Sequence, residues 1–291
     1  MPLAGAVSSE YAVRRDRLRA SLKKEVVVLF GAKESDDLHY SFFQEPNFLY
    51  LSGWEEPGAI LMISPEKDGD ILFLPPRTPA EEKWTGRKLG PDDPVARETT
   101  GFPKVLPTTG FETELKRLLS DYPDLLTTPV VSPSTLLAKA APDLKPTDAK
   151  SLLAKLRMEK SANEIARIQR ATDASIDAHR AAWRSIRSGE YEYQLAARMV
   201  ATYEGEGCRR SAYAPIVGSG PNSTILHYSR NSRRMDSGEV VVMDVAAECD
   251  NYASDITRTI PVNGKFSPRE REIYDIVLGA HNAAIAAIRP A

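Results

Sequence analysis

The chain has 291 residues, of which 42% are apolar and 27% charged, and this composition is typical of a globular protein of one or two domains. Its formal net charge of −2 gives no electrostatic reason to expect nucleic acid or a membrane surface as a partner. No apolar run approaches the length of a membrane span, and the N-terminal segment lacks the pattern of a signal peptide, so we expect a cytoplasmic protein. The two cysteines, Cys208 and Cys249, do not indicate a disulfide framework.

The first half of the chain alternates short apolar runs with helical patterns. A polar stretch predicts a helix over residues 9–24, capped by Ser8 or Ser9. Apolar runs bounded by glycine and proline predict strands at residues 26–30, 48–52, 59–63 and 70–74. Helical patterns follow near residues 78–84 and 111–120. Strands and helices of this kind predict an α/β first domain.

A stretch containing proline and alanine, residues 140–148, is the best candidate for a domain boundary. It divides the chain into a first domain of residues 1–150 and a second of residues 151–291.

Helices dominate the start and the end of the second domain. Ser161 and Glu164 form a capping box, which predicts the start of a long helix that ends at Gly189. Two further helices are predicted, at residues 191–204 and from Ser267-Pro268 to Arg289.

Residues 240–262 read as two extended runs joined by a tight turn. If the hairpin folds about Cys249-Asp250, with Cys249 as a small turn residue, Asp244 lies directly opposite Asp255. Two carboxylates so close repel each other unless a cation neutralises them. Ordinary aspartates at a strand end and a turn would give the same spacing.

Three linked motifs in this region resemble those of aminopeptidase P. They are the runs at residues 216–228, 238–244 and 254–266. That family is the Xaa-Pro aminopeptidase branch of the pita-bread metallopeptidases, which also includes prolidase. Two segments of the first half, residues 48–58 and 84–90, are similar to the family's N-terminal domain. The resemblance implies an α/β N-terminal domain of the creatinase and aminopeptidase P type, followed by the first half of an α+β pita-bread catalytic domain.

The resemblance also implies a site. The family holds two divalent cations with two Asp, one His and two Glu side chains, and Asp244 and Asp255 fall at the Asp positions. Mn²⁺ is the implied ion, with Zn²⁺ or Co²⁺ as alternatives. His227 falls at a family histidine that lines the active site, where it can donate to the scissile carbonyl or move a proton. Tyr213 falls at a position that lines the substrate pocket. A structural histidine and a core tyrosine are the alternative interpretations.

The remaining family ligands, one His and two Glu, belong to the second half of the pita-bread domain, and no residue before Ala291 matches them. His39, His179 and His281 match no family site, and we interpret His179 as a packing or surface residue. We therefore expect little activity from this chain alone. Its expected partners are a peptide substrate and either a second copy of the chain or a complementing second-half polypeptide.

The implied reaction is release of the N-terminal residue from peptides with proline in second position. Prolidase, which acts on Xaa-Pro dipeptides, is the nearest alternative, and a non-catalytic pita-bread protein that binds partners is another. Creatinase shares the fold but works without metal, so Asp244 and Asp255 argue against it.

Overall fold

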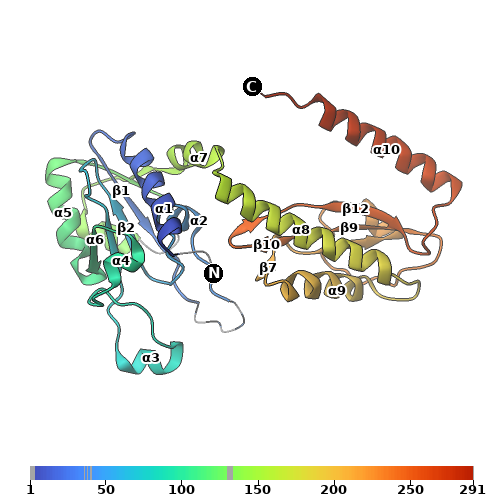
Figure 1. Ribbon diagram of the computed structural model, residues 1–291, viewed down its shortest axis with the longest axis horizontal. Helices are drawn as coiled ribbons and strands as arrows, with labels where there is room; N and C mark the ends of the chain where they lie inside the picture. The colour runs from blue at the N-terminus through green and yellow to red at the C-terminus, as the bar shows by residue number, and fades with distance from the viewer. Residues whose placement is uncertain (1–3, 36, 38, 40, 130–133, 291) are drawn as a thin grey trace. The chain divides into compact units, whose positions relative to one another are not determined.

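The computed structural model describes residues 4–35, 37, 39, 41–129 and 134–290, and Figure 1 shows its elements. The chain divides into two compact units, Met1–Glu159 and Lys160–Ala291. None of the helices among the described residues combines the length and apolar character that crossing a membrane requires.

A six-stranded mixed sheet forms the centre of the first unit, in the order β4-β3-β2-β1-β5-β6. Its strands are β1 (Glu25–Phe30), β2 (Ile60–Ile63), β3 (Ile71–Leu74), β4 (Lys104–Pro107), β5 (Asp124–Thr127) and β6 (Thr147–Asp148). Strands β1, β2 and β3 pair antiparallel, and the other neighbours pair parallel. Alternate residues of β1 enter two different apolar clusters, with Val27 and Leu29 in one and Val26 and Val28 in the other. Both faces of β1 are therefore buried, which explains its unbroken apolar sequence.

Helices surround this sheet and complete the predicted α/β domain. They are α1 (Ala4–Arg19), α2 (Pro46–Ser52), α3 (Pro79–Thr85), α4 (Ala96–Thr100), η1 (Thr108–Gly110), α5 (Phe111–Asp121), α6 (Ser134–Ala140) and α7 (Lys150–Met158). The prediction that Ser8 or Ser9 caps the first helix is wrong, because α1 begins at Ala4 and contains both serines. It also ends before residue 24, because Ser21 and Leu22 bond to carbonyls only three residues back and so tighten the last turn.

The strand predicted at residues 48–52 is also wrong, since this segment is helix α2. Glu45 accepts a hydrogen bond from the Phe48 amide at 2.6 Å, Pro46 occupies the first turn, and Gly53 ends the helix in the left-handed region at φ 66°. Residues 48–52 are all buried, so their apolar sequence carries no period that would separate a helix from a strand.

The second unit packs two helices against two three-stranded antiparallel sheets. Its helices are α8 (Ala162–Ser185), α9 (Glu192–Gly205), η2 (Gly220–Thr224) and α10 (Pro268–Ala287). Its strands are β7 (Arg210–Ser211), β8 (Ile216–Ser219), β9 (Val240–Asp244), β10 (Ala247–Cys249), β11 (Tyr252–Ala253) and β12 (Thr257–Pro261). The sheets have the orders β11-β10-β7 and β12-β9-β8, and α8 and α9 lie side by side along them (Figure 1).

The starts of α8 and α10 follow the sequence signals closely. Ser161 and Glu164 form the predicted capping box, with the serine hydroxyl accepting from the Glu164 amide at 3.2 Å. Helix α8 stops at Ser185, before the predicted end at Gly189. Helix α10 begins after Ser267, as predicted, but none of its residues is buried, and Figure 1 shows it standing apart from the strands of its unit.

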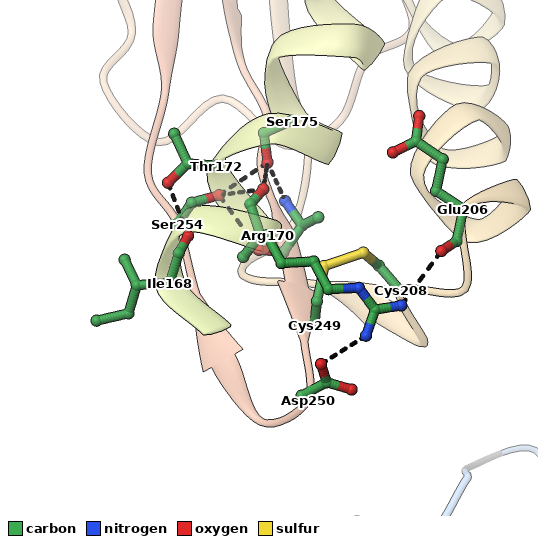
Figure 2. The surroundings of a disulfide bond; sticks show 11 residues. Ile168, Arg170, Thr172, Ser175, Glu206, Cys208, Cys249, Asp250 and Ser254 are labelled. Carbon is green, nitrogen blue, oxygen red and sulfur yellow. Dashed lines mark hydrogen bonds and ion pairs between the residues drawn. A yellow bond between two sulfur atoms is a disulfide. The ribbon is translucent and has the colours of Figure 1, made fainter. Parts of the chain in front are cut away.

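The two cysteines form a disulfide bond, contrary to the prediction that Cys249 is merely a small turn residue. Cys208 follows α9, Cys249 ends β10, and their Cα atoms lie 4.4 Å apart (Figure 2). Both side chains are buried. Beside the disulfide, Arg170 of α8 donates to the carboxylate of Asp250 and to the carbonyl of Glu206. The bond therefore ties the end of α9 to the tip of the β10–β11 hairpin.

Candidate functional site

The hairpin between the two candidate metal ligands sets their positions. Its turn consists of Asp250 and Asn251, which both adopt left-handed backbone conformations with φ of 51° and 66°. Cys249 pairs with Tyr252 across this turn. The predicted turn at Cys249-Asp250 is therefore wrong by one residue.

This shift changes the partner of Asp244 by two residues. Asp244 is directly opposite Thr257, and Asp255 lies two residues before Thr257 in the chain. The Val245 amide donates to the Ile256 carbonyl at 3.2 Å, so the same register continues between the two ladders. The prediction that Asp244 lies directly opposite Asp255 is wrong. The two aspartates are instead diagonal neighbours, a relation in which side chains of one sheet face still reach each other.

The hydroxyl of Tyr213 joins the two carboxylates. It donates to Oδ1 of Asp244 and lies 3.2 Å from Oδ1 of Asp255. Burial raises the pKa of Tyr213, and the hydrogen bond to Asp244 and the charges of both aspartates add to that effect. The phenol therefore stays protonated and remains a donor. One hydroxyl within reach of both aspartates shows that the structure gathers the three predicted residues in one place.

This group of side chains has the chemistry of part of a cation site. Carboxylates only accept hydrogen bonds when ionised, and they are the usual ligands of hard divalent ions. Neither Asp244 nor Asp255 forms an ion pair with any residue that the structure describes. Asp244 is half-buried and Asp255 is exposed, so an ion can reach them. Within the described residues no group of three or more His, Cys, Asp or Glu side chains converges, so this part of the chain offers two candidate ligands here.

His179 holds the strands on which both aspartates stand. It is buried on α8, and its Nε2 lies 3.0 Å from the carbonyl of Val245 and 3.2 Å from that of Ile256. A carbonyl only accepts, so Nε2 must carry the proton. Because Val245 and Ile256 each follow one of the aspartates, a single imidazole fixes both strand ends. The sequence prediction treated His179 as a packing or surface residue and gave no indication of this contact.

His227 is not joined to the aspartates by any hydrogen bond among the described residues. It lies in the turn that follows η2, and its side chain is exposed. Its proposed active-site role remains a prediction. Two residues on either side of His227, Asn222 and Tyr228, are bound to the carboxylate of Glu192.

Comparisons with known proteins identify the family of each unit. Residues 166–291 match the model of "Metallopeptidase family M24", and residues 11–126 match that of "Aminopeptidase P, N-terminal domain". The fold and the paired aspartates thus define the class as a pita-bread metallopeptidase with an aminopeptidase P type N-terminal domain.

Individual relatives narrow the class further. The chain is 33% identical to an Xaa-Pro aminopeptidase of Haemophilus influenzae, over 99% of this chain and 69% of the relative. It is 35% identical to the Escherichia coli Xaa-Pro aminopeptidase, over 72% of this chain and 50% of the relative. The solved structure of proline aminopeptidase P II from Yersinia pestis superimposes with a TM-score of 0.89 and 33% identity, covering 97% of this chain and 69% of that one. The chain belongs to the family of metal-dependent Xaa-Pro aminopeptidases, and it spans between half and about two thirds of the length of these relatives.

Proposed function

We propose that the second unit supplies the two-aspartate side of a dinuclear site that releases the N-terminal residue from peptides with proline in second position. The observation that supports this proposal is the Tyr213 hydroxyl shared by Asp244 and Asp255. Two carboxylates held this close, with no cation paired to them among the described residues, form a place where a divalent ion lowers the electrostatic repulsion. Two ions bound there would supply Lewis-acid charge at the scissile bond.

Each of the chain's own residues has a role in this proposal. Asp244 would chelate one ion and Asp255 would bridge both, with Mn²⁺ as the proposed ion and Zn²⁺ or Co²⁺ as alternatives. Tyr213 orients Asp244 and lines the substrate pocket. His227 would donate to the scissile carbonyl or move a proton.

Metal binding tests the site without requiring activity. Calorimetric titration of residues 1–291 with Mn²⁺ should show binding that is weakened by Asp244→Asn or Asp255→Asn, because each substitution removes one charged ligand. Asp236→Asn, an exposed aspartate of the same unit that pairs with Arg233, is the control and should leave binding unchanged. Equal Mn²⁺ binding by all four proteins would contradict the assignment.

Peptide cleavage tests the reaction. Because the described residues gather only two ligands, residues 1–291 alone should cleave an Xaa-Pro tripeptide negligibly. Co-expression with the segment of the H. influenzae relative that this chain leaves unmatched should restore cleavage, and Asp255→Asn should abolish it again. Robust turnover by residues 1–291 alone would show that no further ligands are needed.

The same assay separates the alternatives. A preference for Xaa-Pro dipeptides over longer peptides would favour a prolidase, and no cleavage by the complemented protein would favour a non-catalytic partner-binding protein. The exposed apolar residues of α10 make a second copy of the chain or a second-half polypeptide the proposed partner. The cytoplasm remains the proposed location. The Cys208–Cys249 disulfide argues against it, because reducing compartments keep most thiols reduced.

A further inference from the structure

A wholly buried carboxylate lies at the start of α9, outside the group of aspartates. Glu192 is the first residue of α9 and is 0% exposed. A charge in that position destabilises the fold unless its lone pairs are satisfied. Here they accept five hydrogen bonds from four residues, and those residues all belong to one segment, residues 219–233.

Each carboxylate oxygen of Glu192 accepts hydrogen bonds from a different part of this segment. Oε1 accepts from the amide and hydroxyl of Ser219 at 2.7 and 2.8 Å and from the side-chain amide of Asn222 at 3.3 Å. Oε2 accepts from the hydroxyl of Tyr228 at 2.7 Å and the amide of Arg233 at 2.9 Å. Burial raises the pKa of Glu192, but the hydrogen bonds from Tyr228, Ser219 and Arg233 outweigh it and leave that pKa below its usual value. The carboxylate is therefore ionised near neutral pH, when it is the stronger acceptor.

His227 lies inside this segment, between two of the anchored residues. Asn222 is bound to Glu192 on one side of it and Tyr228 on the other. The tip itself has little packing of its own, since Leu226 is 90% exposed and Ile225 is 53% exposed. Few buried contacts at the tip mean that its order depends on the residues that flank it.

The base of the segment has separate supports. The side chain of Asn231 accepts from the Val217 amide at 2.9 Å and donates to the Pro215 carbonyl at 2.8 Å. The backbone amide of Glu192 donates to the carbonyl of Arg233 at 3.0 Å, a bond that no side-chain substitution removes. Loss of the Glu192 carboxylate should therefore increase the mobility of residues 225–228, which include His227, without unfolding the unit.

We propose that Glu192 is a positioning residue. Its one buried carboxylate binds residues on both sides of His227 within residues 219–233 and so holds His227 in place. The inference rests on the proposed role of His227 only in its consequence for catalysis. The anchoring itself is a statement about order in the loop and can be tested without activity.

Order is measured directly by NMR relaxation and amide hydrogen exchange on residues 1–291. In the wild type, the backbone order parameters of residues 225–228 should be about 0.85, and in Glu192→Gln they should fall below about 0.6. The amides of Ser219 and Arg233 should exchange roughly tenfold faster or more, because each loses its bond to a charged acceptor. Glu190→Gln is the matched control. Glu190 lies two residues before Glu192 and forms a half-exposed ion pair with Arg198, so its loss should leave the order of residues 225–228 unchanged.

Two results would overturn the proposal. One is a mobile 225–228 segment in the wild type, and the other is an unchanged segment in a folded Glu192→Gln variant. If Glu192→Gln does not fold, Tyr228→Phe keeps the carboxylate and removes one donor, and it should loosen residues 225–228 while the Ser219 amide stays protected. Protection at both places would refute the anchoring equally well.

The complemented enzyme tests the consequence for catalysis. Glu192→Gln should lower kcat by roughly 10–100-fold, the effect expected when a catalytic group is displaced slightly. The double variant Glu192→Gln/His227→Gln should be no slower than His227→Gln alone, because a positioning residue acts through the group it positions. If His227→Gln leaves kcat unchanged, the proposed role of His227 fails while the NMR result on Glu192 stands. Additive losses in the double variant would show that Glu192 acts on another part of the site.

Discussion

The disulfide gives the sharpest prediction about stability. Cys208 and Cys249 are 41 residues apart in the sequence, and the bond between them restricts the unfolded chain to a closed loop of that size. The entropy of closing such a loop corresponds to roughly 4 kcal/mol at 25 °C. Residual structure in the unfolded chain reduces this figure, so it is an upper estimate. A domain is stabilised by only about 5–15 kcal/mol in total, so reduction of the bond should remove a large share of the stability of the second unit.

The first unit serves as an internal control, because it contains no cysteine. Urea unfolding followed by pulsed hydrogen exchange and mass spectrometry reports the two units separately. With a denaturant slope of about 2 kcal/mol per molar, dithiothreitol should lower the urea midpoint of the second unit by about 2 M. The urea midpoint of the first unit should stay unchanged. The Cys208→Ala/Cys249→Ala variant should unfold near the reduced midpoint and should not respond to dithiothreitol.

Either of two outcomes would contradict this prediction. Protein purified without reductant and unfolded in urea should expose no free thiol, so recovery of two thiols per chain would show that the bond is absent. An oxidised second unit with the same midpoint as the reduced one would show that the loop restriction contributes nothing.

Three further predictions concern the same unit. Tyr213→Phe removes the donor to Asp244 and should lower the free energy of unfolding by about 1 kcal/mol, so an unchanged urea midpoint would contradict the contact. Burial lowers the pKa of His179, so the unfolded chain takes up this proton more readily. The stability that the neutral ring gives is complete above about pH 6.5 and declines below it by at most about 1.4 kcal/mol per pH unit. Urea midpoints measured at pH 5.5 and 7.5 should therefore differ less in His179→Gln than in the wild type. Helix α10 exposes 66% of Ile276 and 63% of Val277, so the chain should self-associate at micromolar concentration in light scattering and Ile276→Glu should weaken this, whereas a clean monomer would argue against the prediction.

The sequence predicted the elements that carry a local signal. The capping box at Ser161 and Glu164, the serine and proline that begin α10, and the apolar strands β1, β2 and β3 are all present. The gathering of Tyr213, Asp244 and Asp255 followed from the resemblance to a family and not from spacing alone. What the residues themselves supplied was the argument that two nearby carboxylates need a cation.

The errors arose where tertiary contacts decide between local alternatives. Helix α2 is buried throughout, so its sequence has no exposed face to reveal a helical period. The hairpin register had a usable signal, since Asp250 and Asn251 are residue types that tolerate left-handed backbone, and placing the turn on them gives the observed pairing. Glu192 offered no signal, because a glutamate in a first helical turn usually faces solvent and its partners here lie 27 to 41 residues further along the chain.

In the second unit, polar contacts hold the proposed site residues in place more than apolar packing does. The buried face of α8 consists largely of alanine, at positions 171, 174, 178 and 182, and small side chains let a helix approach a sheet without defining where along the helix each strand lies. Ser175 and His179, one turn apart on that face, define it by bonding the Ala247 amide and the carbonyls of Val245 and Ile256. Glu192 does the same from α9 for residues 219–233. His179 binds the backbone directly after Asp244 and Asp255, and Glu192 binds the hydroxyl of Tyr228, the residue after His227. Substituting either of them should displace those proposed site residues by more than the loss of stability alone would suggest.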